Sequence, residues 1–155
     1  MGTIRSQMLP AFNQAVTNPI RIHGVSMSLK AKWFRDKLRK KGKQGFQGYP
    51  MATVAYYGPD NRHASKAVAA VFLTEGGEPT HLERWFSDQQ DARNDPGINE
   101  AIVRFVQLYG AKSVVMPDGI LGCPHEEGID YPEGQSCPQC PYWAGRDRFT
   151  GERRH

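Results

Sequence analysis

The stretch D-P-G-I-N-E-A-I-V-R-F-V-Q-L-Y-G-A-K-S-V-V-M, residues 95 to 116, contains the start and stop signals of a helix and a short strand after it. Asp95 can cap the helix, Pro96 suits its first position, and Gly110 follows its end. The last four residues predict a short apolar strand, Ser113 to Met116. One apolar stripe at helical spacing lies between these signals, comprising Ile98, Ala101, Ile102, Phe105, Leu108 and Tyr109.

Two strands and another helix are expected before this unit. Ala52 to Tyr57 is a β-rich run that ends at a chain reversal, Gly58-Pro59-Asp60. Apolar residues then recur at helical spacing and predict a helix from Ala64 to Phe72. Thr80 to Phe86 predicts a second strand, whose charged residues favour an edge position. The fold class is therefore α/β, with a small three-stranded parallel or mixed sheet in the order β-α-β-α-β.

Four soft metal ligands follow this body. Cys123 and His125 form a C-x-H pair, and after eleven further residues Cys137 and Cys140 form a C-x-x-C pair, so that every cysteine of the chain is included. Zinc binds four thiolate and imidazole ligands tetrahedrally. We therefore expect one zinc ion in a C-terminal loop, with a structural rather than a catalytic role.

Two other chemistries stay open for these residues. The C-x-H and C-x-x-C pairs resemble a Rieske iron-sulfur segment, although Cys140 stands where that family has histidine. An iron-sulfur cluster is thus the alternative cofactor. His125-Glu126-Glu127 with Cys137 and Cys140 resembles the zinc deaminase signature, in which Glu127 would be the general base. Only residues 128 to 136 separate its two halves, too few for the strand and helix of a deaminase core.

Aspartates follow each predicted strand. Parallel strands would place Asp60, Asp88 and Asp118 at one rim of the sheet, where ligands of such sheets bind. The candidate catalytic residues are Asp60, Asp118 and Glu127, around a pocket for a cationic group or a harder metal such as magnesium. The competing interpretation is that these aspartates form turns and caps. Whether the protein is an enzyme stays open.

Positive charge is concentrated at the start of the chain. Residues 1 to 43 carry a net charge of +9, whereas residues 44 to 155 carry −5. A basic amphipathic helix is expected from Leu29 to Lys41, capped by Ser28 and stopped by Gly42. Its cations could neutralise phosphates of RNA or DNA while an aromatic residue stacks on bases. The candidate nucleic-acid-binding residues are Lys30, Lys32, Trp33, Arg35, Lys37, Arg39, Lys40, Lys41 and Lys43.

Other partners stay open for this helix. It could contact an anionic membrane surface peripherally, with Trp33 and Phe34 among the headgroups. Its apolar face could instead pack on the body while its charges are solvated. The acidic body could also bind a protein partner.

Length and composition set the expected domain organisation. With 155 residues, 39% of them hydrophobic, the chain can bury one modest core. We expect a flexible extension over 1–26, the basic helix and a glycine-rich linker over 27–50, the α/β body over 51–118, and a metal-binding module packed on it over 119–155. The chain shows neither a signal-peptide segment nor a transmembrane run, and a disulfide would leave one cysteine unpaired. A reducing cytoplasm is therefore the expected location.

Two longer motifs resemble an uncharacterised bacterial protein family. They are Y-G-P-D, Tyr57 to Asp60, and G-C-P-H-E-E-G-I-D-Y-P, Gly122 to Pro132, and the resemblance extends from Tyr49 to Glu152. It implies a cytoplasmic bacterial protein and brings no activity with it. The residues themselves predict a zinc-stabilised protein that binds RNA or DNA through its basic arm. A metalloenzyme or an iron-sulfur redox protein is the alternative.

Overall fold

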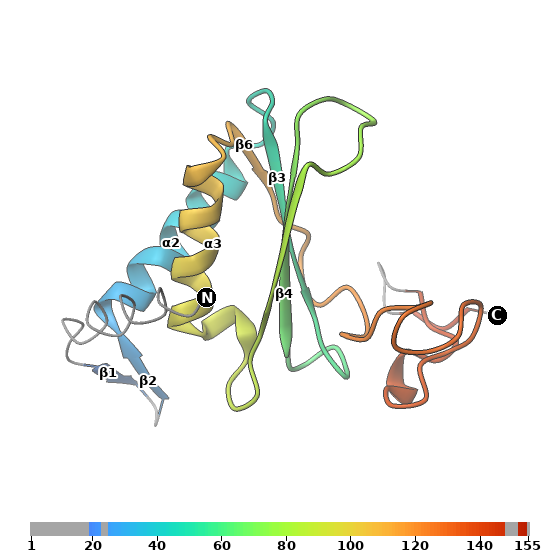
Figure 1. Ribbon diagram of the computed structural model, residues 1–155. Coiled ribbons are helices and arrows are strands. Elements are labelled where there is room, and N and C mark those ends of the chain that lie inside the picture. The colour runs from blue at the N-terminus through green and yellow to red at the C-terminus, as the bar shows by residue number, and fades with distance from the viewer. Residues whose placement is uncertain (1–18, 23–24, 148–151, 155) are drawn as a thin grey trace, which may run out of the picture.

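The computed structural model describes residues 19–22, 25–147 and 152–154, and its main feature is a β-sheet with both long helices on one side (Figure 1). The C-terminal segment that carries the four candidate ligands lies on the opposite side. The elements are, in order, β1 Pro19–Ile22, β2 Val25–Ser28, α2 Leu29–Lys43, β3 Met51–Tyr57, β4 Lys66–Phe72, β5 His81–Phe86, the 3-10 turn η2 Ala92–Asn94, α3 Pro96–Leu108, β6 Ser113–Val115 and the 3-10 turn η3 Pro141–Trp143.

The main sheet is mixed and has four strands rather than the three that the sequence predicts. Its order is β5-β4-β3-β6. β4 is antiparallel to both of its neighbours, whereas β6 is parallel to β3. The edge position expected for the strand at 80–86 is confirmed, because β5 lies at one margin of the sheet.

The helix predicted from Ala64 to Phe72 is wrong, since Lys66–Phe72 forms strand β4. This strand is buried on both sides along most of its length, so its apolar residues form a near-continuous run without clear alternation. Such a run cannot be distinguished from a helix by periodicity alone. The pairs Val54↔Ala69 and Ala52↔Val71 place fully or almost fully buried side chains under the helices, and the alanine leaves room for close packing.

Helix α3 matches its sequence signals closely. The Asp95 carboxylate accepts hydrogen bonds from the backbone N–H groups of Gly97 and Ile98, at 2.9 and 3.1 Å. These bonds satisfy two of the donors that a helix start leaves unpaired. Ile102 and Phe105 are buried in the core. The strand predicted after the helix is also confirmed as β6, one residue shorter than expected.

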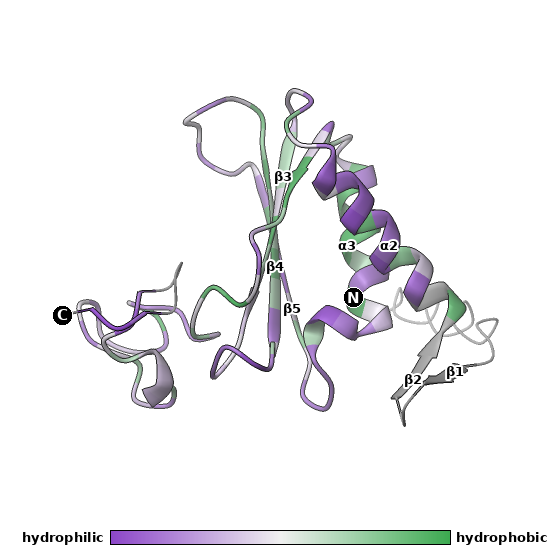
Figure 2. Cartoon of the chain, turned by 180° about the vertical axis from the view of Figure 1, so that it is seen from behind, coloured by the Kyte–Doolittle hydropathy of each residue, from purple (hydrophilic) through white to green (hydrophobic). Residues whose placement is uncertain are grey.

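Helix α2 confirms the predicted basic helix, although it continues through Gly42 to Lys43. Phe34 and Leu38 are buried in the core, whereas Leu29 and Trp33 are 64% and 54% exposed. Only part of the predicted apolar face therefore packs on the body. Most of the residues of α2 are hydrophilic (Figure 2).

A short hairpin precedes α2 that the sequence analysis did not predict. β1 and β2 pair antiparallel, with Ile20 opposite Met27. The hairpin overlaps the extension predicted to be flexible over 1–26, of which residues 1–18, 23 and 24 lie outside the described part of the chain. Among the described residues, no helix has both the length and the apolar character needed to cross a membrane.

The different burial of two residues on α3 predicts that their substitution changes the free energy of unfolding by very different amounts. Ile102 is fully buried, whereas Leu108 on the same helix is 74% exposed. We expect Ile102→Ala to lower the free energy of unfolding by about 2–5 kcal/mol, because it leaves a cavity. Leu108→Ala, the matched control, should change it by less than about 0.5 kcal/mol. Urea denaturation followed by circular dichroism measures both, and equal effects would contradict this assignment of the core.

Candidate metal centre

The segment that leads to the first candidate ligand is fixed to the end of β3. Ile120 forms a parallel bridge with Tyr56, and the N–H of Leu121 donates to the Tyr56 carbonyl at 2.8 Å. The N–H of Gly58 then donates to the carbonyl of Gly122 at 2.9 Å. Cys123 is therefore the first residue after a segment that is hydrogen-bonded to the C-terminal end of β3.

Gly58 holds the C-terminal module at a second point. Its carbonyl accepts a hydrogen bond from Trp143 Nε1 at 2.8 Å, and Trp143 packs against the core. Trp143 thus packs the C-terminal module against the body. Only glycine fits at position 58, because a Cβ there would lie 1.9 Å from the carbonyl oxygen of His63.

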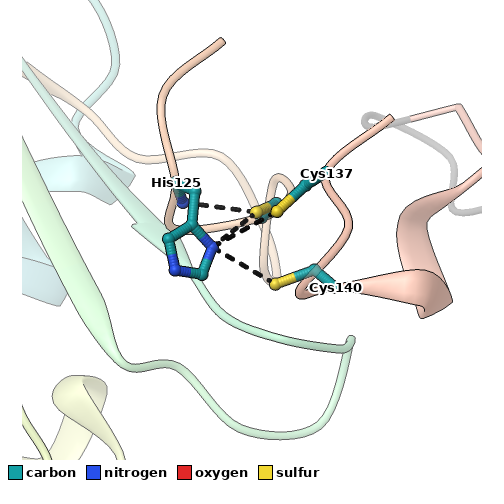
Figure 3. Close-up of side chains that lie close together, drawn as sticks. His125, Cys137 and Cys140 are labelled. Atoms are coloured by element: carbon teal, nitrogen blue, oxygen red, sulfur yellow. Dashed lines mark hydrogen bonds between the residues drawn. The ribbon is translucent and has the colours of Figure 1, made fainter. Parts of the chain in front are cut away.

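The four candidate ligands converge on one point. The ligand atoms of Cys123, His125, Cys137 and Cys140 all lie within 4.8 Å of one another. His125 Nδ1 is 3.2 Å from the sulfur of Cys123 and 3.5 Å from the sulfurs of both Cys137 and Cys140 (Figure 3). These residues could therefore hold one metal ion.

Local backbone structure brings the last two cysteines together. The N–H of Cys140 donates to the carbonyl of Cys137 at 3.4 Å, which closes the C-x-x-C turn. The N–H of Trp143 donates to the Cys140 carbonyl at 3.1 Å, so the turn continues directly into η3. The tryptophan that contacts Gly58 thus also positions the ligand pair.

The three cysteine side chains of the site are largely shielded from solvent. Cys137 and Cys140 are 7% and 2% exposed, and Cys123 is half-buried. Burial raises the pKa of both the Cys123 and the Cys140 thiol, and the neighbouring cysteines add to the rise at Cys123. Ionisation of the Cys123 and Cys140 thiols is therefore disfavoured unless a cation lies beside them. A metal ion bound between these residues would supply that cation and displace the thiol protons.

A buried lysine lies beside the ligands, and no motif in the sequence indicates its position. Lys66 is 4% exposed, and its ammonium group donates to the carbonyl of Pro124, between the first two ligands, at 2.9 Å. Lys66 Nζ also lies 3.5 Å from a Glu126 carboxylate oxygen, whose other oxygen accepts from Arg84 at 2.7 Å. The bond from Arg84 and the charge of Lys66 together lower the pKa of Glu126.

The candidate catalytic residues are not gathered at one site. Asp60 accepts from the backbone N–H groups of Arg62 and His63, as in a turn. Asp118 and Asp88 line separate clefts, on the helix side of the sheet and beside the metal centre. Within the described chain, no group of three or more carboxylates could hold a cation. Glu127 accepts the backbone N–H of Gly134 at 2.7 Å. Their catalytic roles stay predictions.

The candidate nucleic-acid-binding residues lie along α2, with different surroundings. Lys32 pairs with Asp36 at 3.0 Å, and Lys37 lies over the Trp33 ring at 4.7 Å. Arg39, Lys40 and Lys43 are exposed, while Arg35 and Lys41 are half-buried. The side chain of Lys30 lies outside the described part of the structure.

No protein-family model, curated protein or solved structure matches this chain. The similarity to an uncharacterised bacterial family therefore stays a prediction. The chemistry of the centre has to be inferred from its own residues.

The contact between Trp143 and Gly58 predicts a local effect of mutation. Trp143→Phe keeps an aromatic ring but leaves the Gly58 carbonyl without its indole donor. We expect the Gly58 N–H, which donates to Gly122, to exchange with solvent at least about tenfold faster, because an unpaired buried carbonyl costs about 1–3 kcal/mol. Amide hydrogen exchange measures this change. Tyr142→Phe, which removes only a neighbouring hydroxyl, is the control, and an equal effect of both variants would contradict the anchoring role.

Proposed function

We propose that the protein binds one structural zinc ion through Cys123, His125, Cys137 and Cys140. The convergence of the three sulfurs on His125 Nδ1, at 3.2–3.5 Å, supports this proposal. Zinc–sulfur bonds of about 2.3 Å and a zinc–nitrogen bond of about 2.0 Å in a tetrahedron separate nitrogen from sulfur by about 3.5 Å. The three nitrogen–sulfur distances thus agree with the spacing around a single tetrahedral ion.

The same spacing favours one ion over an iron-sulfur cluster. A two-iron cluster divides its four protein ligands into two pairs, one pair on each iron. The two pairs are then separated by the cluster itself. Here one nitrogen lies within 3.5 Å of all three sulfurs, which leaves no such separation.

A structural role agrees with the surroundings of the ion. Four protein ligands complete a tetrahedron, and a closed tetrahedron has no position for a reacting water molecule. Glu127, the general base of the deaminase interpretation, is instead bound to the Gly134 backbone. Three thiolates and a neutral imidazole give a zinc site a net charge of −1, and the nearby ammonium group of Lys66 offsets it.

Metal analysis tests the zinc proposal. We expect about one zinc ion per purified chain and no visible absorption, because zinc has no partly filled d shell. Cys137→Ser should lower the zinc content and make the segment from 119 to 155 more sensitive to limited proteolysis, since metal binding and local folding are coupled.

Ser136→Ala is the matched control, because it changes the neighbouring residue without removing a ligand. This variant should keep its zinc and its protease resistance. A brown protein that absorbs in the visible range would overturn the zinc proposal in favour of an iron-sulfur centre.

We further propose that the protein binds RNA or DNA through the exposed surface of α2. Helix α2 carries eight lysines and arginines and one acid, Asp36, and its last turn contains Lys40, Lys41 and Lys43. Within the described chain, neither Lys40 nor Lys41 forms a salt bridge. A row of cations without counter-charges suits the phosphates of a nucleic acid strand.

Salt dependence tests this second proposal. In filter-binding titrations with a single-stranded RNA and a duplex DNA, affinity should fall steeply as salt rises. Lys40→Gln should reduce the slope of log affinity against log salt by about 1. Lys112→Gln, an exposed lysine outside α2, should leave the slope unchanged. The proposal fails if neither nucleic acid binds at low salt or if both substitutions have the same effect.

A further inference from the structure

A cleft on the helix side of the sheet has features that the metal centre does not explain. It has a volume of about 540 Å³ and lies between α2, the start of α3 and the segment that follows β6. The metal centre lies on the other side of the sheet (Figure 1). The two sites are therefore separate.

The cleft is strongly positive. Among the described residues that line it, Asp118 is the only acid and four side chains are cationic, namely Arg35, Arg39, Lys43 and Arg93. The Arg93 guanidinium is neutralised by Asp91, which it contacts at 2.7 and 2.8 Å. Arg39 and Lys43 form no salt bridge with any residue that the structure describes. The lining thus presents positive charge that suits an anion.

Two buried polar atoms of the lining lack hydrogen-bond partners. Asn99 is 1% exposed, and its Nδ2 donates to the Arg93 carbonyl at 3.2 Å, which fixes the orientation of the amide. Among the residues that the structure describes, its Oδ1 is buried with no hydrogen-bond donor, and Arg35 Nε is buried with no hydrogen-bond acceptor, although an Asp36 carboxylate oxygen lies 4.0 Å away. Leaving a buried polar atom unpaired costs about 1–3 kcal/mol. A ligand that offers both an anionic acceptor and a hydrogen donor would pair both atoms.

Tyr56 adds a donor to the same lining. Its ring is buried at the end of β3 and lines the cleft. Burial raises the pKa of Tyr56 to about 12. The hydroxyl therefore keeps its proton at neutral pH and can donate a hydrogen bond to an anion.

We propose that this cleft binds the monoanion of a terminal phosphate group, the form that keeps one O–H hydrogen, either in a free phosphate monoester or at the end of a nucleic acid strand. Arg39 and Lys43 supply the charge, Arg35 Nε a donor, and Asn99 Oδ1 accepts the hydrogen of the phosphate or of an adjacent hydroxyl. This inference does not depend on the zinc site; it shares Lys43 with the proposed nucleic-acid surface of α2 but does not require a nucleic acid to bind there. Sulfate is the informative comparison, because it has the shape of phosphate but no hydrogen at neutral pH.

The first experiment compares inorganic phosphate with sulfate. The full chain is titrated with each anion at constant ionic strength, by calorimetry and by NMR of the Asn99 side-chain amide. We expect phosphate to bind at least about tenfold more tightly than sulfate and to shift the Asn99 resonances, because only phosphate can donate to Oδ1. No phosphate binding at millimolar concentration, equal binding of sulfate, or unshifted Asn99 resonances would each overturn the proposal.

Two variants that each lose one positive charge test whether phosphate binds in the cleft. Arg39→Gln should weaken phosphate binding about tenfold, whereas Arg153→Gln, an exposed arginine of the C-terminal module, should leave it unchanged. If both variants weaken phosphate binding equally, the weakening comes from the lost net charge and not from a site in the cleft, and the proposal is overturned. The Asn99 resonances of the unmodified protein give an independent readout if a variant folds poorly.

The source of the phosphate is distinguished with two further probes. Glycerol 3-phosphate represents a small phosphorylated molecule, and a 5′-phosphorylated dinucleotide, compared with its 5′-hydroxyl form, represents a strand end. Tighter binding of glycerol 3-phosphate than of phosphate assigns a small molecule. Binding of only the phosphorylated dinucleotide assigns a strand end. A third outcome would refute the monoester site. In that outcome both dinucleotides bind equally well and glycerol 3-phosphate does not bind, so the protein recognises the nucleotides and not the terminal phosphate.

Discussion

The parallel pairing of β6 with β3 is the constraint on which the other parts of the structure depend. It joins Met51 to Ser113 across some sixty residues of chain. Within that interval the chain must form the β3–β4–β5 meander and then return over the sheet through α3. The same pairing directs the chain after β6 along the remainder of β3, where Ile120 meets Tyr56. The position of the metal centre thus follows from the placement of one three-residue strand.

The sequence predicted the elements whose signals are local. Asp95 and Pro96 mark the start of α3 through backbone chemistry that acts within a few residues, and the metal ligands are recognisable by spacing alone. Strand β4 was mistaken for a helix because its identity depends on neighbours that are distant in sequence. Ala67 and Val71 suit either structure until β3 and β5 supply their hydrogen bonds. Tertiary context, rather than propensity, decides such a segment.

The sequence pattern likewise does not predict which residues contact the metal centre without being ligands. Lys66 reads as the first residue of an apolar run, yet its ammonium group reaches the chain between Cys123 and His125. No spacing rule relates residues that lie 58 positions apart. The unpaired Oδ1 of Asn99 is a similar case, since asparagine within a helix is ordinary until its surroundings are known. In both cases a polar group becomes informative only through its burial.

Strand β5 has a consequence for how the protein behaves at high concentration. As an edge strand it exposes a row of backbone groups to which a strand of another molecule could add. Glu83 is paired with Ala69, under the helices, whereas Arg84 is paired with Val68 on the opposite face. An incoming strand would therefore meet a charged side chain on each face of the sheet. The charges at this edge therefore oppose the addition of strands from other molecules, the step by which fibrils grow.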